Sequence, residues 1–307
     1  MPRYLFAMQK IMGEKVNWLY FLLFILFSSC TKEVGITLPP IESKLVLTSL
    51  FTADRLLNVH ISKSVGITDT ADLIVENATA TLYKNGTFLE ILDYDSNGFY
   101  ISTNILKTTE NYEIKVAAPS FQQVQSTAQI PEQVNLIATN FTQNAGVDEE
   151  GDNFSTVSIQ FHDQESTQDF YEIQFYEEHL GYEDEKFIYN FGGFSYDPII
   201  KAEGDQEYYP DYLLLSDELI NGETVNLDIN FFDRSSSDRT LKIYLEFRAV
   251  SRDYYLYKKS LIRHLANQFP DIWDGTGEPA QLFTNIENGY GIFAGYTVDS
   301  DTVYKSN

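Results

Sequence analysis

Short alternations of apolar and polar residues mark the first third of the chain and predict β-strands. Residues 44–51 and 57–62 alternate with a period of two, as strands with one buried face do. Two further strand pairs are separated by Asn85-Gly86 and Asn97-Gly98. Asn-Gly favours tight hairpin turns because both central residues adopt positive φ. We therefore expect a small antiparallel β-sandwich over residues 43–130.

A second region with the same alternation follows from Pro131. Its longest alternating runs are residues 170–176 and 241–250. Residues 251–268 then change to a helical period, with Ser251 as the candidate N-cap. Residues 289–296 contain three glycines and predict a bulged strand that closes this second domain. The expected fold class is all-β, with two sandwich-like domains (43–130 and 131–307) and one packed α-helix at about 251–268.

The N-terminal segment has the three parts of an export signal. Basic residues precede an apolar run at 18–27, which is shorter than the roughly twenty residues that cross a bilayer as a helix. The chain's single cysteine, Cys30, follows two serines and resembles the lipobox of bacterial lipoproteins. That resemblance implies that residues 1–29 are removed, that Cys30 is lipidated and that residues 30–42 form a tether. The alternative is a membrane anchor with an incidental cysteine.

Charge and composition narrow the functional classes. The chain has 21 basic and 45 acidic residues, a formal net charge of −24. Such a chain repels nucleic acid, so we expect no nucleic-acid partner. A hydrophobic content of 43% excludes wholesale disorder. A single cysteine leaves no disulfide framework.

Residues 80–82, 95–100 and 112–116 follow one another as a strand, an Asp-Gly-aromatic turn and a strand with a tyrosine that enters the core. This succession resembles the carboxypeptidase-regulatory-like, transthyretin-type sandwich. The resemblance concerns the fold of the first domain and implies little about activity.

The C-terminal part carries a more specific resemblance. Residues 249–261, Glu278-Pro279 and residues 283–296 together resemble a family of Bacteroidota outer-membrane lipoproteins catalogued as domain of unknown function 4249. The resemblance extends over nearly the whole chain after Cys30. Members are commonly encoded beside TonB-dependent outer-membrane receptors, so the resemblance implies a location and a kind of partner, and it implies no catalytic residue.

Candidate chemical motifs are incomplete. Residues 93–98 match the first half of a calcium loop, but position twelve is Asn104 instead of glutamate, and a hairpin turn explains the run better. The acidic run 148–152 is either solvated surface or a calcium loop, and we favour the former. The four histidines lack metal-ligand spacing. Residues 193–197 miss the last glycine of the nucleophile elbow. We expect no metal, no cofactor and no catalytic site.

An aromatic, glycine-rich stretch from Lys186 to Leu214 is the most unusual part of the second domain. Exposed aromatic side chains suit sugar stacking or flat contacts with a protein. The alternative is that the alternating rings at 187–191 form one strand's core face. The candidate contact residues, beside a proline and several carboxylates, are Tyr208, Tyr209 and Tyr212.

Together these observations predict a non-catalytic outer-membrane lipoprotein, with the cell surface favoured over the periplasmic face. We expect it to act as an accessory or docking subunit of a TonB-dependent receptor or another transport or assembly complex. The expected partners are an outer-membrane β-barrel receptor and, through acylated Cys30, the lipid bilayer. The alternatives are a structural cell-surface adhesin and, less well supported, a secreted hydrolase.

Overall fold

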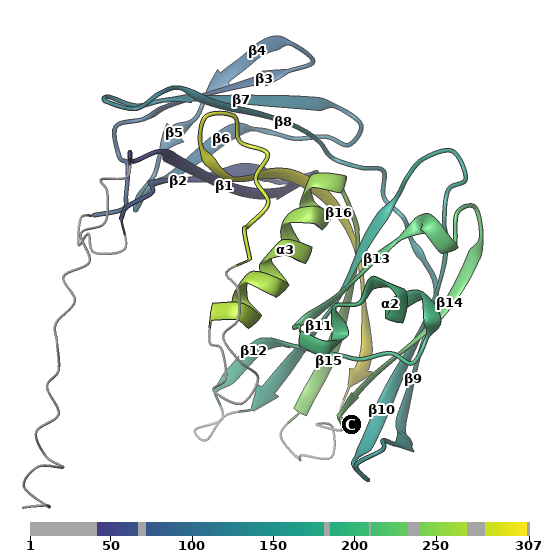
Figure 1. The fold of residues 1–307 in the computed structure, drawn as a ribbon. Coiled ribbons are helices and arrows are strands. Elements are labelled where there is room, and N and C mark those ends of the chain that lie inside the picture. Colours follow the sequence, from purple (N-terminus) through teal and green to yellow (C-terminus); the bar gives the residue numbers. More distant parts are fainter. Residues whose placement is uncertain are drawn as a thin grey trace, which may run out of the picture. The chain divides into compact units, whose positions relative to one another are not determined.

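A computed structural model describes residues 42–66, 72–180, 185–208, 210–232, 240–268 and 280–305 (Figure 1). The predicted signal, Cys30 and nearly all of the predicted tether lie outside the described residues, as does Tyr209. The described chain is mainly β-strand, and α3 (Arg252–Gln268) is its one long helix. The predicted all-β, sandwich-like fold with a helix near the C-terminus is therefore confirmed.

Nine strands form the largest sheet, and they come from both ends of the chain. Its path runs β12-β11-β15-β16-β1-β2-β6-β5, with β13 also pairing with β11. In that order the strands are β12 (Lys186–Phe191), β11 (Phe170–Leu180), β15 (Thr240–Val250), β16 (Tyr290–Lys305), β1 (Leu45–Thr52), β2 (Leu56–Lys63), β6 (Phe99–Ile105), β5 (Asp93–Tyr94) and β13 (Tyr212–Ser216).

Two smaller sheets pack against the two halves of this path. The first is β4-β3-β7-β8, with β4 (Thr87–Ile91), β3 (Thr79–Lys84), β7 (Asn111–Ala117) and β8 (Val124–Gln129). Its buried residues share one hydrophobic core with β1, β2 and β6. The second is β14-β10-β9, with β14 (Thr224–Phe232), β10 (Asn153–His162) and β9 (Leu136–Val147). It shares a separate core with β11, β13 and β15.

Local turn signals in the sequence were reliable. Asn85 and Gly86 have φ of 51° and 76°, and Asn97 and Gly98 have φ of 48° and 79°. These values are those of the tight hairpin turns that Asn-Gly favours. The second turn connects β5 to β6, so the run that resembles half of a calcium loop is a hairpin, as we expected.

The final strand, β16, is longer than predicted and links the two halves of the chain. Residues 290–296 pair in parallel with β1, and residues 296–305 pair antiparallel with β15. The sequence pattern indicated a strand that closes the second domain, whereas β16 pairs with strands from both halves of the chain. Residues 42–307 form one compact unit. The predicted boundary at residues 130–131 falls between β8 and β9, and the division into two folding domains stays a prediction.

Gly291 allows the close approach of β16 to β1. Its φ is +110°, and a Cβ at this position would lie 1.9 Å from the carbonyl oxygen of Leu47. No other residue fits there without moving one of the two strands.

Helix α3 covers the face of the large sheet beside β11 and β16 (Figure 1). Tyr254, Tyr255 and Ile262 of the helix share a third hydrophobic core with Ile292 and Ala294 of β16. Ser251 accepts a hydrogen bond from the Tyr254 backbone N–H, as expected of an N-cap. Among the described residues no helix has the length and apolar character needed to cross a membrane.

Candidate interaction surfaces

The predicted tyrosine contacts occupy different environments. Tyr208 lies in the short helix η1 (Gln206–Tyr208) and is 39% exposed. Tyr212 instead packs against α3: its hydroxyl donates to the backbone oxygen of Lys258 at 3.1 Å, and the Lys258 ammonium lies 3.6 Å from the centre of its ring. Burial raises the pKa of Tyr212 above its ordinary value. Tyr212 is therefore partly buried and packs against α3, and its role as a partner contact stays a prediction.

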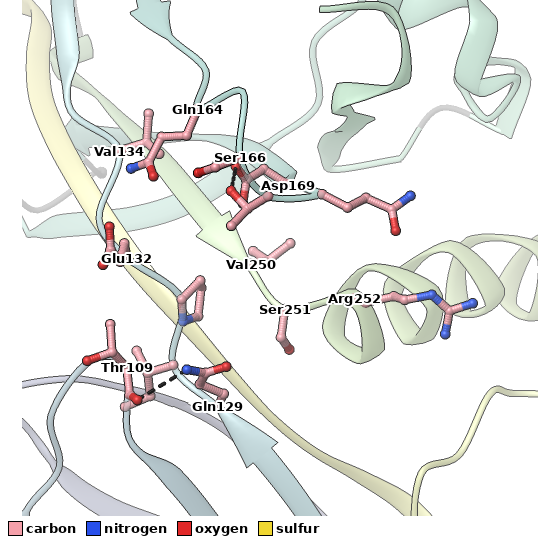
Figure 2. A pocket seen from close by; sticks show the side chains of 14 residues that line it. Thr109, Gln129, Glu132, Val134, Gln164, Ser166, Asp169, Val250, Ser251 and Arg252 are labelled. Carbon is pink, nitrogen blue, oxygen red and sulfur yellow. Dashed lines mark hydrogen bonds between the residues drawn. The ribbon is translucent and has the colours of Figure 1, made fainter. Parts of the chain in front are cut away.

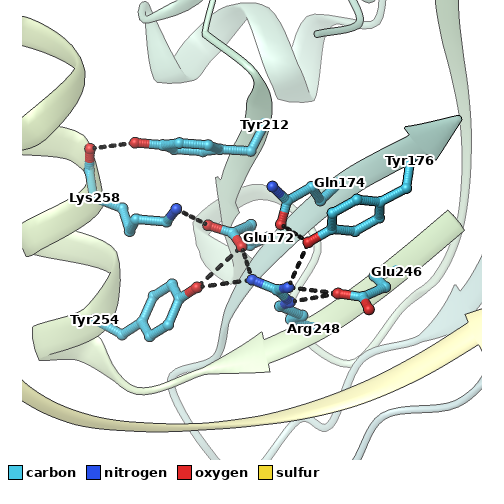
Figure 3. Close-up of polar contacts among 8 residues, drawn as sticks. All are labelled: Glu172, Gln174, Tyr176, Tyr212, Glu246, Arg248, Tyr254 and Lys258. Atoms are coloured by element: carbon cyan, nitrogen blue, oxygen red, sulfur yellow. Dashed lines mark hydrogen bonds and ion pairs between the residues drawn. The ribbon is translucent and has the colours of Figure 1, made fainter. Parts of the chain in front are cut away.

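A buried charge network explains why Tyr212 is held inward (Figure 3). Glu172 on β11 is fully buried between the sheet and α3. One of its oxygens lies 2.7 Å from Arg248 Nη1 of β15 and accepts the Tyr254 hydroxyl at 3.0 Å, and the other lies 3.2 Å from Lys258 Nζ. Because a buried carboxylate needs such partners, the network fixes where α3 sits on the sheet.

A second polar cluster joins the short helix α2 (Pro198–Glu203) to α3. Glu203 accepts hydrogen bonds from Lys259 Nζ, from the Ser216 backbone N–H and from the Tyr255 hydroxyl. Burial works to raise the pKa of Glu203, but the hydrogen bonds from Lys259, Tyr255 and Ser216 outweigh it, so the pKa lies below its ordinary value. Burial and the neighbouring Glu203 carboxylate raise the pKa of Tyr255 to about 12. These contacts give the charged residues a structural role.

Residues of the incomplete chemical motifs also make structural contacts. The hydroxyl of Ser195, in the near-match to a nucleophile elbow, is buried and donates to the backbone oxygen of Asp228 at 2.5 Å. His60 packs on the ring of Phe99, with ring centres 4.8 Å apart. In the acidic run, Asp148 accepts backbone N–H groups from Glu150 and Asp152, which closes the turn between β9 and β10.

Figure 2 shows a pocket of about 450 Å³. It adjoins a group of three carboxylates. Asp169 lines it, and one oxygen from each of Asp163, Asp169 and Asp217 lies within 4.8 Å of the others. Asp163 accepts from the Tyr171 hydroxyl at 2.5 Å, and Asp217 accepts from the Asp169 backbone N–H at 2.8 Å. Burial and repulsion from the neighbouring carboxylates raise the pKa of Asp169. These hydrogen bonds hold the loops around the pocket together.

The segment that contains the predicted aromatic stretch crosses from the large sheet to the sheet β14-β10-β9. We call the part from Gly192 to Pro210 the excursion. A Cβ on Gly192 would lie 2.6 Å from the carbonyl oxygen of Pro210, so the two ends of the excursion lie against each other. Phe194 exchanges backbone hydrogen bonds of 2.8 and 2.7 Å with Asn230 at the edge of β14. The pair Gly192-Gly193 was the visible sequence signal: a Cβ on Gly192 would meet the backbone of Pro210, and a Cβ on Gly193 would lie 2.9 Å from the side chain of Ile229.

This crossing assembles a cluster of four aromatic rings, which we call the ring cluster. Its members are Phe154 of β10, Phe232 of β14, and Phe194 and Tyr196 of the excursion, with centre-to-centre distances of 5.4–6.3 Å between neighbouring rings. Tyr196 and Phe232 are each 49% exposed. The sequence singled out Phe194 and Tyr196 but missed Phe154 and Phe232, which lie in separate strands.

The outward side of the same sheet is lined with paired polar side chains, which we call the polar ladder. Each pair joins a residue of β10 to the residue directly opposite it on β14. The pairs and their distances are Thr156–Asn230 (2.7 Å), Ser158–Asp228 (2.5 Å), Gln160–Asn226 (2.8 Å) and His162–Thr224 (3.1 Å). Phe154 stands opposite Phe232 in the next position, so the ring cluster continues the ladder at one end.

A second open surface is the outward side of β2 and β6, which we call the apolar face. Leu56 and Ile105 stand opposite each other there and are 50% and 58% exposed. Phe99 and Tyr290 are exposed too, on β6 and at the start of β16. An antiparallel sheet that faces water usually carries polar residues on that side, so exposed apolar side chains in register indicate a contact surface.

Comparison with known proteins gives one result. No curated protein matches the chain. A family described as "Domain of unknown function (DUF4249)" matches it over residues 31–302, which is most of its length. In the structure, the residues that carry the C-terminal resemblance include Val250, Tyr254, Ile292 and Ala294 of the core beneath α3. The chain belongs to the DUF4249 family.

Proposed function

We propose that this protein is a lipid-anchored, non-catalytic docking subunit of an outer-membrane receptor or assembly complex, displayed at the cell surface. The observation that carries the proposal is the apolar face of β2 and β6, where Leu56 and Ile105 are exposed opposite each other at one end of the strand pair and Phe99 is exposed at the other end of β6. Exposed apolar patches on a folded protein mark interaction surfaces. The lipidated Cys30 and the β-barrel receptor partner are parts of this proposal.

The connection to the membrane favours a partner that is also in the membrane. Fifteen positions separate Cys30 from Leu45, the first residue of β1. A fully extended chain advances about 3.5 Å per residue, so β1 lies within about 50 Å of a lipid on Cys30. Confinement near the membrane raises the effective concentration of a co-anchored partner, and a modest interface is then sufficient.

Tyr208 and Tyr209 remain a second proposed contact. Tyr208 is partly exposed at the end of η1, beside the carboxylates of the Glu203–Asp217 region. Changing both tyrosines to Ala should weaken the complex by roughly 2 kcal/mol or more if they are central anchors. Tyr212 is left out of this contact because it packs under Lys258.

Extraction in mild detergent and mass spectrometry of the co-purified proteins test the proposal. The tagged wild-type protein should bring a β-barrel receptor with it, and the Leu56→Lys/Ile105→Lys variant should lose it without a change in melting temperature. Phe187→Lys/Ile188→Lys is the matched control, since these side chains are equally exposed but lie on β12. The docking role would be refuted if the wild-type protein were recovered alone in several mild detergents while the receptor encoded beside it is expressed. The adhesin alternative would then lead.

A further inference from the structure

The polar ladder and the ring cluster form one continuous surface on the sheet β14-β10-β9. The ladder offers amide, hydroxyl and imidazole groups from alternate residues of two strands. The ring cluster lies in register with the end of this ladder. Hydrogen-bonding groups and aromatic rings thus follow each other along the strands, on the side of the sheet away from its hydrophobic core.

The rings are held open to solvent by features that do not depend on a ligand. The Phe154 ring lies against Gly146, where even a Cβ would be 2.5 Å from the ring. Phe194 is fixed by its two backbone hydrogen bonds to Asn230. Tyr196 is supported by the Lys201 ammonium, 5.2 Å from the centre of its ring. The exposed rings of Tyr196 and Phe232 therefore stand on a preorganised base, which reduces the entropy lost when a ligand binds.

The charge of this surface distinguishes it from the rest of the protein. Charged residues make up 21% of the chain. In the three strands β9, β10 and β14, all of whose residues the structure describes, Asp228 is the only aspartate, glutamate, lysine or arginine. On these three strands a cationic ligand would find one carboxylate, and an anionic ligand would be repelled by a chain of net charge −24. The surface is suited to a neutral, polar ligand.

We propose that this surface binds a neutral oligosaccharide chain. The C–H faces of a sugar ring are apolar and would pack on Tyr196 and Phe232, while the hydroxyl groups would exchange hydrogen bonds with polar side chains of the ladder. The exposed members of the ladder that offer such groups are His162, Thr224, Asn226 and Asp228. Because the surface is a sheet face instead of a deep pocket, we expect weak binding that several sugar units share.

This inference goes beyond the docking proposal and does not depend on it. The apolar face lies on β2 and β6, and the proposed sugar surface lies on β10, β14 and the excursion after β12. A protein partner on the ring cluster is the competing interpretation, because exposed aromatic rings also occur in protein interfaces. The two interpretations predict different losses in the same variants.

Affinity electrophoresis of the detergent-solubilised full chain tests the inference. The probes are three neutral polysaccharides cast separately into native gels: dextran, galactomannan and xyloglucan. We expect at least one of them to retard the wild-type protein. Tyr196→Ala/Phe232→Ala should lower the apparent affinity for that polysaccharide by tenfold or more, Asn226→Ala should lower it less, and Tyr196→Phe should retain it. Phe187→Ala/Ile188→Ala, on β12 and outside the ring cluster and the ladder, should behave as wild type.

The outcomes separate the two proposals. Absence of retardation by all three neutral polysaccharides, or equal retardation of the wild type and the folded Tyr196→Ala/Phe232→Ala variant, would overturn the inference. Loss of the co-purified receptor in that variant, without any polysaccharide binding by the wild type, would instead make the ring cluster a protein interface. Sugar binding without a receptor would leave the inference intact and refute the docking role. Melting temperatures of all variants check that each is folded.

Discussion

Replacing Phe293 with Ala tests whether the family's C-terminal residues build the core. Phe293 is fully buried on β16, and its ring centre lies 4.5 Å from that of Phe51 on β1. Removing a buried phenylalanine ring costs about 3–5 kcal/mol of unfolding free energy. The cavity cannot collapse easily here, because the backbone N–H and C=O of Phe293 are both held by the side chain of Asn285. We therefore expect about 4 kcal/mol, in the middle of that range.

Urea unfolding and thermal melting both measure this loss. For a protein of this size each kcal/mol lowers the melting temperature by about 2–4 °C, so a fall of about 8–16 °C is expected. Phe88→Ala is the control, since that ring is exposed on β4 and its removal should cost less than about 0.5 kcal/mol. A Phe293→Ala variant within 1 kcal/mol of the wild type would refute the packing argument. Loss of partner binding at an unchanged melting temperature would make this motif an interface.

Three further predictions concern the anchor and two groups of charges. Cys30→Ala should abolish acylation and leave uncleaved precursor on an immunoblot, and normal processing with retention in the outer membrane would contradict the lipoprotein assignment. Lys258→Met removes a partner of buried Glu172 and should lower the free energy of unfolding in urea by about 3 kcal/mol. Glu172→Gln/Lys258→Met should recover much of this stability, and equal losses of stability in the single and the double variant would exclude coupling between the two side chains. The pKa of Asp169 is raised in the folded state, so the folded state holds the proton of this carboxyl more tightly than the unfolded state does. The folded state therefore loses stability as the pH rises from the unfolded pKa through the folded pKa. Asp169→Asn should therefore raise the free energy of unfolding at pH 7 by less than about 1 kcal/mol, seen as a higher melting temperature, and the gain should disappear below about pH 4. The same gain at low pH would refute this explanation.

Local patterns in the sequence predicted the features that depend on neighbouring residues. The Asn-Gly turns, the alternating strands and the helix at 252–268 follow from the φ preference of two residues or from a period of 2.0 or 3.6. The buried Tyr112, with its hydroxyl accepting from the Lys107 backbone N–H at 2.8 Å, agrees with the expected tyrosine that enters the core. These signals are short in sequence, and tertiary contacts do not reverse them.

The features that sequence reasoning missed depend on contacts between distant segments. Alternation along β11 makes Glu172 an outward residue, and only the packing of α3 over that face makes it buried. Tyr212 turns inward for the same reason. The ring cluster draws on two strands and the excursion after β12, so no single stretch of sequence shows all four rings. A hydrophobic pattern indicates which side of a strand is apolar, but it does not indicate which element covers the other side.

The parallel pairing of β1 with β16 has a consequence for how the chain folds. Leu47 and Gly291 are direct partners, although about 240 residues of chain separate them. Because a chain is synthesised from its N-terminus, β1 is made early, and the strand that completes its sheet is made near the end. Until then one edge of β1 is unpaired and the core around Phe51 lacks Phe293, which exposes both to aggregation. A chaperone that keeps the first strands from aggregating is therefore expected to matter more for this fold than for one whose first strands pair only with each other.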